Sequence, residues 1–424
     1  MAGEGEQPSP LPVLLDVSRL VSRIGQGPLT GIDRVEAEWL TYLQNRPHLL
    51  LCRLGQRQVL LPPKAGALIL DWAAGRAEPS ARGWLARALG RDTPRQRAMT
   101  ALARHALRKG DRRGRGLARG LRRLPGAVLL NVGHSNIDAG LWAALGVPVA
   151  VLIHDTIPLD HPEYTRPDQV ARFRQRFTVA MQGAALALTI SEATAARVRD
   201  WRGRLGLPET APVVPAHIGT RLADSDPQAI PAGLDLTRPF FLSIGTIEPR
   251  KNHALLLDAW DLLAARLAPE KMPQLLLIGR RGWLNRDVFA RLDALSPDSP
   301  VRELSGLSDS AVAALLERSH GLLMPSHAEG FGLPLTEAAG RGLPVLSSSL
   351  PSSREVLGDY ARYLPADDPR PWAGAVSLLA AEAPLRLPPR IVPNWAAHFA
   401  TAETALHGLV EGTAKDGGGR WRAG

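Results

Sequence analysis

The sequence is poor in cysteine and has no long hydrophobic run. Cys52 is the single cysteine among 424 residues, which excludes internal disulfides and cysteine-rich zinc sites. We therefore expect a reducing compartment and a Cys52 side chain buried as a small apolar group. The longest uncharged run, residues 139–153, is too short to span a membrane and contains Pro148, so we expect no transmembrane helix.

The amino-terminal residues lack the pattern of a secretory signal. No basic segment precedes a long apolar run there, and residues 11–15 form only a short strand-like stretch. We therefore expect a cytoplasmic protein. Apolar residues are abundant, at 45% of 424 residues, which is enough to bury the cores of two domains.

Positive charge is in excess, with a formal net charge of +10, and the segment between Arg91 and Arg123 supplies most of it. Its arginines and lysine are interleaved with leucines: Arg95, Arg97, Arg104, Arg108, Lys109, Arg112, Arg113, Arg115, Arg119, Arg122 and Arg123 with Leu102, Leu107, Leu117 and Leu121. Such a basic, partly amphipathic stretch can lie on an anionic membrane surface. A solvated arginine-rich helix explains it equally well. Nucleic-acid binding, the third reading, is not expected.

Apolar runs separated by helical or loop stretches predict a Rossmann-like sheet in the first half of the chain. These runs are residues 12–17, 49–54, 127–132, 148–153 and 185–191. A proline-rich stretch up to Pro239 favours an interdomain linker. We predict an α/β protein with an N-terminal domain at 1–220, a linker at 221–239, a second Rossmann-like domain at 240–390 and a C-terminal segment at 391–424. That last segment should hold a helix over 395–410 and a frayed tail from 411.

Residues 325–337 are the most informative segment for function. Two carboxylates, Glu329 and Glu337, flank a glycine turn that follows a short apolar strand at 321–324. Open α/β sheets bind ligands at the carboxyl ends of such strands. The two side chains can therefore reach opposite ends of one bound molecule, although a loop residue and a helix-terminal acid would be the simpler explanation of either glutamate alone.

The turn between the two glutamates suits a phosphate-bearing ligand. Gly330 and Gly332 let the backbone approach a ligand closely. Pro334 stands where a helix can begin, and the free NH groups of a helix amino terminus favour a diphosphate.

A second strand-turn carries adjacent cations. The predicted strand at 240–245 ends in Gly245, and Arg250 and Lys251 lie before the next amphipathic helix. Arginine offers a planar fork and lysine a compact point charge, a combination suited to phosphate oxygens. A solvated basic turn is the alternative.

Together with a third strand-turn at 275–283, these segments resemble the retaining glycosyltransferases of family 4, which have the GT-B architecture of two Rossmann-like domains facing each other across a cleft. In the C-terminal half the resemblance covers, in order, residues 245–253, 279–283, 304–309, 325–337, 342–345 and 354–356. In the N-terminal half it covers residues 30–35, 153–158 and 161–164. Only Gly27 and Gly31 represent the glycine-rich amino-terminal loop of many members.

The resemblance implies a role for each matching residue. Arg250 and Lys251 would stabilise the departing diphosphate, Glu329 would bind the donor sugar near its anomeric carbon, and Glu337 would bind the ribose. His154, at the carboxyl edge of the first sheet and facing the cleft, would lie beside the donor sugar. The remaining donor-site candidates are Gly330, Phe331, Gly332, Leu333, Gly245, Thr246, Gly279 and Leu307, and the acceptor or glycine-loop candidates are Gly31, His134 and Asp155. His134 could instead cap the following helix.

No cofactor or metal is expected. Asp224 and Asp226 resemble the paired aspartates by which another glycosyltransferase architecture holds a divalent metal, but they lie in the predicted linker. Arg250 and Lys251 could do the electrostatic work of a metal ion.

We therefore expect a retaining, metal-independent hexosyltransferase. It would move a mannose-like sugar from a nucleoside-diphosphate sugar to a lipid-linked sugar or glycan in cell-surface polysaccharide synthesis. It would work in the cytoplasm, with contact to the inner face of the membrane left open. Two alternatives also stay open: a GT-B sugar-nucleotide epimerase or glycan phosphorylase, and a non-enzymatic basic protein that binds membrane or nucleic acid.

Overall fold

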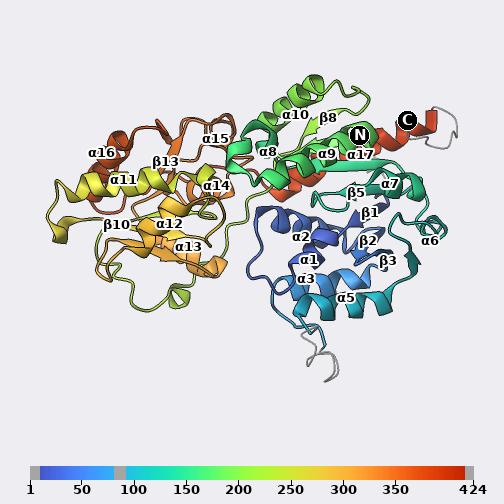
Figure 1. The fold of residues 1–424 in the computed structure, drawn as a ribbon, viewed down its shortest axis with the longest axis horizontal. Helices are drawn as coiled ribbons and strands as arrows, with labels where there is room; N and C mark the ends of the chain where they lie inside the picture. Colours follow the sequence, from blue (N-terminus) through green and yellow to red (C-terminus); the bar gives the residue numbers. More distant parts are fainter. Residues whose placement is uncertain (1–9, 81–91, 416–424) are drawn as a thin grey trace, which may run out of the picture.

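The computed structural model describes residues 10–80 and 92–415, which form two α/β halves, each built on its own sheet (Figure 1). The first sheet has the order β4-β3-β2-β1-β5-β6-β7-β8, and the second has the order β11-β10-β9-β12-β13-β14. All pairs in the second sheet are parallel, whereas β3 pairs antiparallel with both β2 and β4 in the first. The predicted α/β class is confirmed.

The strand bounds place both sheets along the chain. The first sheet consists of β1 (Val13–Asp16), β2 (His48–Leu54), β3 (Arg57–Leu61), β4 (Arg108–Gly110), β5 (Val128–Asn131), β6 (Val149–Ile153), β7 (Leu186–Thr189) and β8 (Val213–Pro215). The second consists of β9 (Phe240–Ile244), β10 (Gln274–Ile278), β11 (Val301–Leu304), β12 (Gly321–Met324), β13 (Val345–Ser348) and β14 (Arg362–Leu364). The five predicted apolar runs of the first half are β1, β2, β5, β6 and β7. The domain boundaries at 220, 239 and 390 stay predictions.

Helices cover both faces of each sheet. In the first half they are α1 (Ser18–Arg23), α2 (Gly31–Leu43), α3 (Lys64–Ala73), α5 (Pro94–His105), α6 (Ala118–Leu121), α7 (Ala139–Leu145), α8 (Ile157–Asp160), α9 (Pro167–Gly183) and α10 (Glu192–Arg204). Later in the chain they are α11 (His253–Ala264), α12 (Arg286–Asp293), α13 (Asp309–Arg318), α14 (Leu333–Gly340), α15 (Pro351–Leu357), α16 (Pro369–Ala380) and α17 (Trp395–Lys415). Short 3-10 turns are η1 (Pro162–Tyr164), η2 (Pro227–Ala229), η3 (Pro249–Lys251) and η4 (Pro269–Lys271).

Alternate residues of the central strands enter different cores. In β10, Leu275 and Leu277 pack with α11, α12 and α16, whereas Leu276 and Ile278 pack with α13, α14 and α15. This is the pattern of a strand buried on both faces, which is why it reads as an unbroken apolar run. Cys52, on β2, is fully buried as expected, and burial raises the pKa of its thiol.

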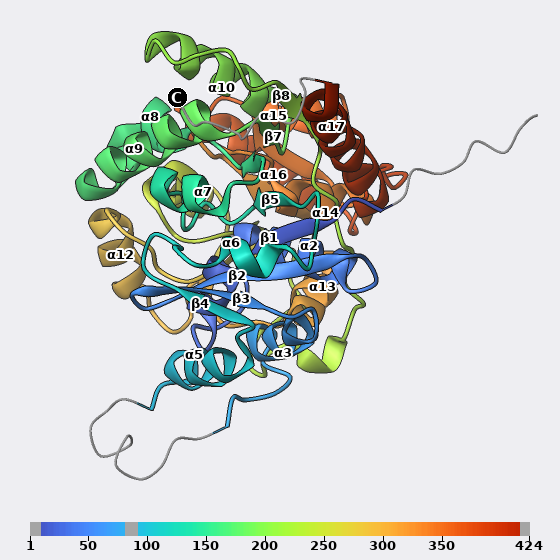
Figure 2. The same ribbon diagram turned by 90° about the vertical axis from the view of Figure 1, so that its right-hand side faces the viewer.

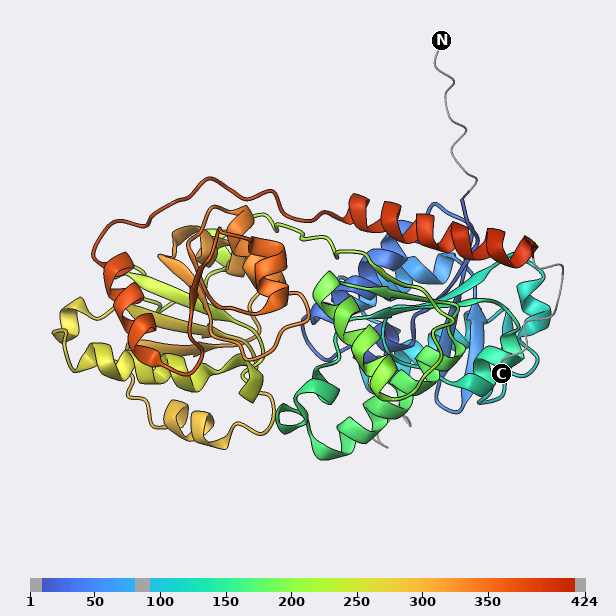
Figure 3. The same ribbon diagram turned by 90° about the horizontal axis from the view of Figure 1, so that it is seen from above.

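Helix α17 returns from the second half to pack on the first, as Figure 3 shows. The Phe399 ring stacks on Tyr42 of α2 with centroids 3.8 Å apart, and Glu403 pairs with Arg46 at 2.5 Å. The helix spans residues 395–410, where one was predicted, and it packs on the first half. The helix continues to Lys415, past the predicted start of the frayed tail, and the last nine residues lie outside the described ones.

The basic segment, described over residues 92–123, does not form one continuous helix. It forms α5, the edge strand β4 and the short α6, which Figure 2 shows as separate pieces. Its apolar side is used inside the protein, because Leu102, Leu117 and Leu121 are all buried in the cores of the first half. These leucines are therefore not free to rest on a membrane, and membrane contact through the arginines alone stays a prediction. Arg91 lies outside the described residues.

Across the parts of the chain that the structure describes, no helix combines the length and the apolar character that a membrane span requires.

Candidate active site

The loops after β6, β7 and β12 bring the two halves into contact. Ser191 donates from Oγ to the carbonyl of Gly330 at 3.0 Å. A Cβ atom on Gly330 would lie 2.5 Å from the carbonyl oxygen of His154, so a side chain there would force the halves apart. Glycine is therefore required at position 330, where residues 325–337, the glutamate motif, meet the carboxyl edge of the first sheet.

Further contacts across this boundary fix the halves relative to each other. Glu355 accepts from the backbone NH groups of Glu192 and Ala193, at 2.6 and 2.8 Å, and so caps the free amino end of α10. On another side, Trp283 donates from its indole to the carbonyl of Tyr164 at 2.9 Å, and the Tyr164 ring stacks on His327. His327 thus contacts the first half through its ring, while its backbone NH donates to the carbonyl of Arg250 at 2.7 Å.

Arg250 and Lys251 converge on Glu329. Lys251 Nζ lies 2.5 Å from Glu329 Oε1, and Arg250 Nη1 lies 3.0 Å from Glu329 Oε2. Arg250 also pairs through Nε with Glu248 at 2.6 Å. Side-chain exposures are only 9% for Lys251 and 7% for Glu329, so this is a buried charge cluster at the ends of β9 and β12.

The cations keep Glu329 ionised. Burial alone would raise its pKa, but the charges of Lys251 and Arg250, with hydrogen bonds from Lys251 and Ser326, lower the pKa of Glu329 to about 2. The ionised form of Glu248 is stabilised less, because burial raises its pKa and the charge of Arg250 only partly opposes the rise. Glu248 was not among the predicted site residues, although it stands between Gly245 and the two cations.

Two glycines explain how residues 245–251, the cation turn that carries Arg250 and Lys251, reach the neighbouring strand. Gly245 has φ +145°, and a Cβ atom on Gly279 would overlap the Gly245 carbonyl. The backbones after β9 and β10 can therefore touch, which brings Gly245, Thr246 and Gly279 together beside Lys251. Leu307 follows β11, the next strand of the sheet, and is half-buried.

Glu337 is held by the opposite half of the molecule. It lies on α14, whose N-cap is Gly332 with φ +90°, preceded by the buried Phe331. Its Oε1 accepts from Arg34 Nη1 at 3.1 Å, and Arg34 Nη2 lies 2.5 Å from Asp309. Leu333 is the first residue of the helix. Arg34 and Asp309 both lie inside segments of the family resemblance, but nothing local indicated that they meet.

The two candidate histidines of the first half face backbone carbonyls. His154 is buried directly after β6, and its Nε2 lies 2.7 Å from the carbonyl of Val132. Burial lowers the pKa of His154 to about 4, so the ring is neutral at pH 7. The His134 Nε2 lies 2.8 Å from the carbonyl of Leu152. A helix-capping role for His134 is wrong, because Asp138 caps α7.

The other two candidates of the first half lie in turns. Asp155 is half-buried after His154 and accepts from the NH of Ile157 at 3.1 Å. Burial raises the pKa of Asp155, and Arg250 opposes the rise. Gly31 is the first residue of α2, behind its N-cap Thr30.

Part of the chain matches a known protein family. Residues 225–386 match the family model described as Glycosyl transferases group 1. This part of the chain is a glycosyl transferase group 1 domain. The cation turn, the glutamate motif, Gly279 and Leu307 all lie within it.

Several curated relatives of this chain are mannosyltransferases. The serotype-specific mannosyltransferase WbdA of Escherichia coli is 30% identical over 247 residues, which are 55% of this chain but 30% of WbdA. The O-antigen chain mannosyltransferase B of Escherichia coli is 29% identical over 49% of this chain and 54% of its own length. The chain thus matches only part of each of these relatives.

Solved structures confirm the GT-B fold around the glycosyl transferase domain. Anabaena Alr3699/HepE, solved in complex with UDP and glucose, has a TM-score of 0.57 at 15% identity and covers 96% of this chain and 99% of its own. Sucrose-phosphate synthase from Thermosynechococcus elongatus has a TM-score of 0.56 at 14% identity over 96% and 98% of the two chains.

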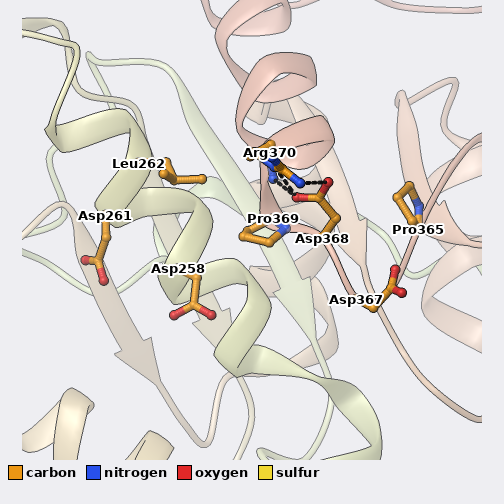
Figure 4. A pocket seen from close by; sticks show the side chains of 8 residues that line it. All are labelled: Asp258, Asp261, Leu262, Pro365, Asp367, Asp368, Pro369 and Arg370. Atoms are coloured by element: carbon orange, nitrogen blue, oxygen red, sulfur yellow. Dashed lines mark hydrogen bonds and ion pairs between the residues drawn. The ribbon is translucent and has the colours of Figure 1, made fainter.

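Two acidic features lie outside the candidate site. Asp226 caps η2 by accepting from Gln228, and the described residues hold no cluster of three or more His, Cys, Asp or Glu side chains that could bind a metal. An open hollow of about 900 Å³ lies between α11 and the start of α16 (Figure 4). Three of its four carboxylates are paired within the protein, Asp258 and Asp261 with Arg291 and Asp368 with Arg370.

Proposed function

We propose that this protein is a retaining, metal-independent hexosyltransferase. It transfers a mannose-like hexose from a nucleoside-diphosphate sugar to a lipid-linked sugar or glycan in cell-surface polysaccharide synthesis. The names of the curated relatives support the sugar and the pathway. The observation that carries the proposal is the convergence of Arg250 and Lys251 on Glu329 in a buried site at the sheet edge.

The cation pair suits a leaving diphosphate. In the proposed reaction, the bond between the sugar C1 and the diphosphate oxygen breaks, and negative charge develops on that oxygen. The contacts within the protein use Nε and Nη1 of Arg250 and one of the three Nζ hydrogens of Lys251. The remaining donors stabilise the diphosphate from a dry, fixed position, where such stabilisation is strongest.

Glu329 would orient the sugar. With a pKa of about 2 it is ionised at any working pH and accepts hydrogen bonds from sugar hydroxyls while the cations hold it in place. The acceptor hydroxyl attacks C1 on the face that the diphosphate leaves. Its proton passes to the leaving diphosphate oxygen, so no protein nucleophile is required.

His154 would contribute an acceptor. A carbonyl oxygen can only accept, so the Nε2 that faces Val132 must carry the proton. Nδ1 of the neutral ring is then free to accept from a sugar hydroxyl. A purely electrostatic scaffold would require none of these buried arrangements.

The proposal is tested first by ligand binding. The full chain is unfolded thermally with UDP, GDP, ADP and their hexose derivatives, because a ligand that binds only the folded state raises the midpoint. We expect one nucleotide series to raise it in a saturable way. If no nucleoside diphosphate or sugar nucleotide raises the midpoint, the proposal is wrong.

Turnover with the donor selected by that panel tests the reaction itself. With a glycan acceptor we expect a product linked in the donor's anomeric configuration, read by NMR coupling constants. An inverted linkage contradicts the retaining assignment. Isomerised sugar nucleotide, or release of sugar 1-phosphate from a glycan, would instead identify the epimerase or the phosphorylase.

A further inference from the structure

Arg34 connects the first half of the molecule to the carboxylate that the proposed function assigns to the ribose. It lies on α2, and its guanidinium spans Glu337, at 3.1 Å, and Asp309, at 2.5 Å, both from the second half. We propose that Arg34 is the positioning residue of the ribose site and fixes the Glu337 carboxylate for the ribose hydroxyls. Because Glu337 is taken as the ribose ligand, this assignment rests on the proposed function.

Arg34 is itself placed by a rigid helix start. Thr30 caps α2 in a capping box with Asp33, the residue next to Arg34. The carboxylate of Asp33 is fully buried and is held by Arg19 at 2.8 Å and by Arg23 at 3.1 Å. The first turn of α2 therefore cannot shift without breaking a buried charge cluster, and Arg34 leaves it in a fixed direction.

Glu337 depends on Arg34 because its other neighbours do not hold it. Arg341, one turn later on α14, donates to Glu317 at 2.7 Å instead. The charged groups that face Glu337 are Arg34 from α2, Asp309 from the start of α13, and Arg341 from its own helix. Burial raises the pKa of Glu337, Asp309 adds to the rise, and the two arginines oppose it. Loss of Arg34 should raise this pKa further.

An arginine can share this carboxylate with a ribose. Each carboxylate oxygen accepts two hydrogen bonds, and Arg34 uses one site on Oε1. The other sites can accept from the two vicinal hydroxyls, provided that Glu337 is ionised and correctly turned. A protonated or rotated Glu337 would lose those bonds while leaving the diphosphate grip intact, so the effect of Arg34 should appear in the recognition of the ribose hydroxyls.

The experiment measures that recognition in the full chain. Calorimetry gives the Kd of UDP, of GDP and of their 2′,3′-dideoxy counterparts at pH 8 and pH 6. Hydrogen bonds to a charged group predict that wild type prefers the nucleotide with both hydroxyls by roughly 10- to 100-fold. In Arg34→Met this preference should fall to about threefold or less, and it should be more sensitive to a fall in pH than in wild type, because the pKa of Glu337 is raised further.

Two further variants make the test specific. Arg34→Lys keeps the charge and should give an intermediate preference; it decides the question if the methionine variant does not fold. Arg221→Met is the matched control, since it breaks another ion pair of α2, the two 2.9 Å bonds from Arg221 to Glu38, without touching Glu337. It should keep the wild-type preference at both pH values.

The contrary outcomes are distinct. Equal loss of affinity for both nucleotides in Arg34→Met would mean that Arg34 only closes the cleft, and tighter binding would mean that it blocks the site; either result overturns the inference. If wild type binds nucleotides without preferring the hydroxyls, the ribose site and this inference fail, while the transferase proposal stands on its turnover test. If wild type binds neither UDP nor GDP and the nucleotide panel also fails, both proposals fall.

Discussion

Two groups of cations in this protein differ in how they are held. Arg250 and Lys251 lie in a buried turn, and both form ion pairs with carboxylates on neighbouring segments. The basic segment spreads its exposed arginines over α5, β4, α6 and the turns beside them, where Arg115, for example, pairs with Asp111. The first group can act by exact placement of charge, whereas the second can act only through its summed field.

The largest effect on turnover should come from the buried pair. We expect Lys251→Ala to lower kcat roughly 100-fold or more, because it removes a donor that strengthens as the diphosphate gains charge. Steady-state kinetics with the preferred donor measure the change. Arg122→Ala, which removes an exposed cation of the basic segment, is the control and should stay within about twofold of wild type. Near-normal turnover in Lys251→Ala would contradict the proposed role of Lys251 in stabilising the leaving diphosphate.

Glu329→Gln should lower kcat somewhat less, by roughly 10- to 100-fold, because it weakens hydrogen bonds to the transferred sugar. Affinity for the bare nucleoside diphosphate should change much less, since the phosphate donors remain. A calorimetric affinity loss as large as the loss in kcat would contradict this division of roles.

The pH dependence of the stability lost in Glu329→Gln follows from the direction of the pKa shift of Glu329. The pKa of Glu329 falls from 4.5 to about 2 on folding, so its charge contributes stability above pH 4.5 that is lost only as the pH falls towards 2. The difference in Tm between wild type and Glu329→Gln should therefore stay constant between pH 7 and pH 5. A difference that shrinks within this range would show that Glu329 is not held by the two cations.

Much of the donor side could be predicted because its residues are contiguous. A buried strand, a glycine and the functional side chains follow one another in residues 240–251 and 321–337, so local patterns indicated both turns. Contacts between the halves could not be predicted this way. Arg34 and Glu337 are 303 residues apart, and their meeting depends on how two separate sheets face each other.

The basic segment shows the opposite failure, a local pattern that misled. Its leucines, interleaved with arginines, indicated a partly amphipathic stretch that could lie on a membrane surface. Instead, residues 108–110 pair antiparallel with β3 at the sheet edge, and this pairing turns Leu107 and Leu117 towards the core. Charge at an edge strand discourages further strand pairing. Sequence periodicity alone could not distinguish this structural use of arginine from a membrane-binding one.

Reversing the basic segment should hardly change turnover on a short soluble acceptor, while it removes any attraction to lipid. We expect Arg108, Arg112, Arg115 and Arg119, all changed to Glu, to abolish sedimentation with anionic liposomes, at roughly 1 kcal/mol per residue. Because the leucines are buried, binding should be purely electrostatic and should vanish at high salt. The matched control reverses four exposed arginines of the second half, Arg266, Arg286, Arg318 and Arg362, for an equal change in net charge.

That control should keep liposome binding, which separates a localised surface from net charge alone. If wild type ignores anionic liposomes at low salt, the segment is only a solvated, edge-protecting surface. If both quadruple variants lose binding equally, net charge rather than the segment attracts the lipid.

The smallest effect should follow metal removal. Fixed cations at Arg250 and Lys251 take the place that a divalent ion would have beside a diphosphate, so turnover after dialysis against EDTA should stay within about twofold of the untreated enzyme. The sharper form of this test uses Lys251→Ala. If the lysine does the work of a metal ion, added Mg²⁺ or Mn²⁺ should not stimulate wild type, whereas any stimulation should be confined to the variant that has lost its cation. Loss of wild-type activity in EDTA that Mn²⁺ restores would show that the buried cations are insufficient and would bring Asp224 and Asp226 back as metal ligands.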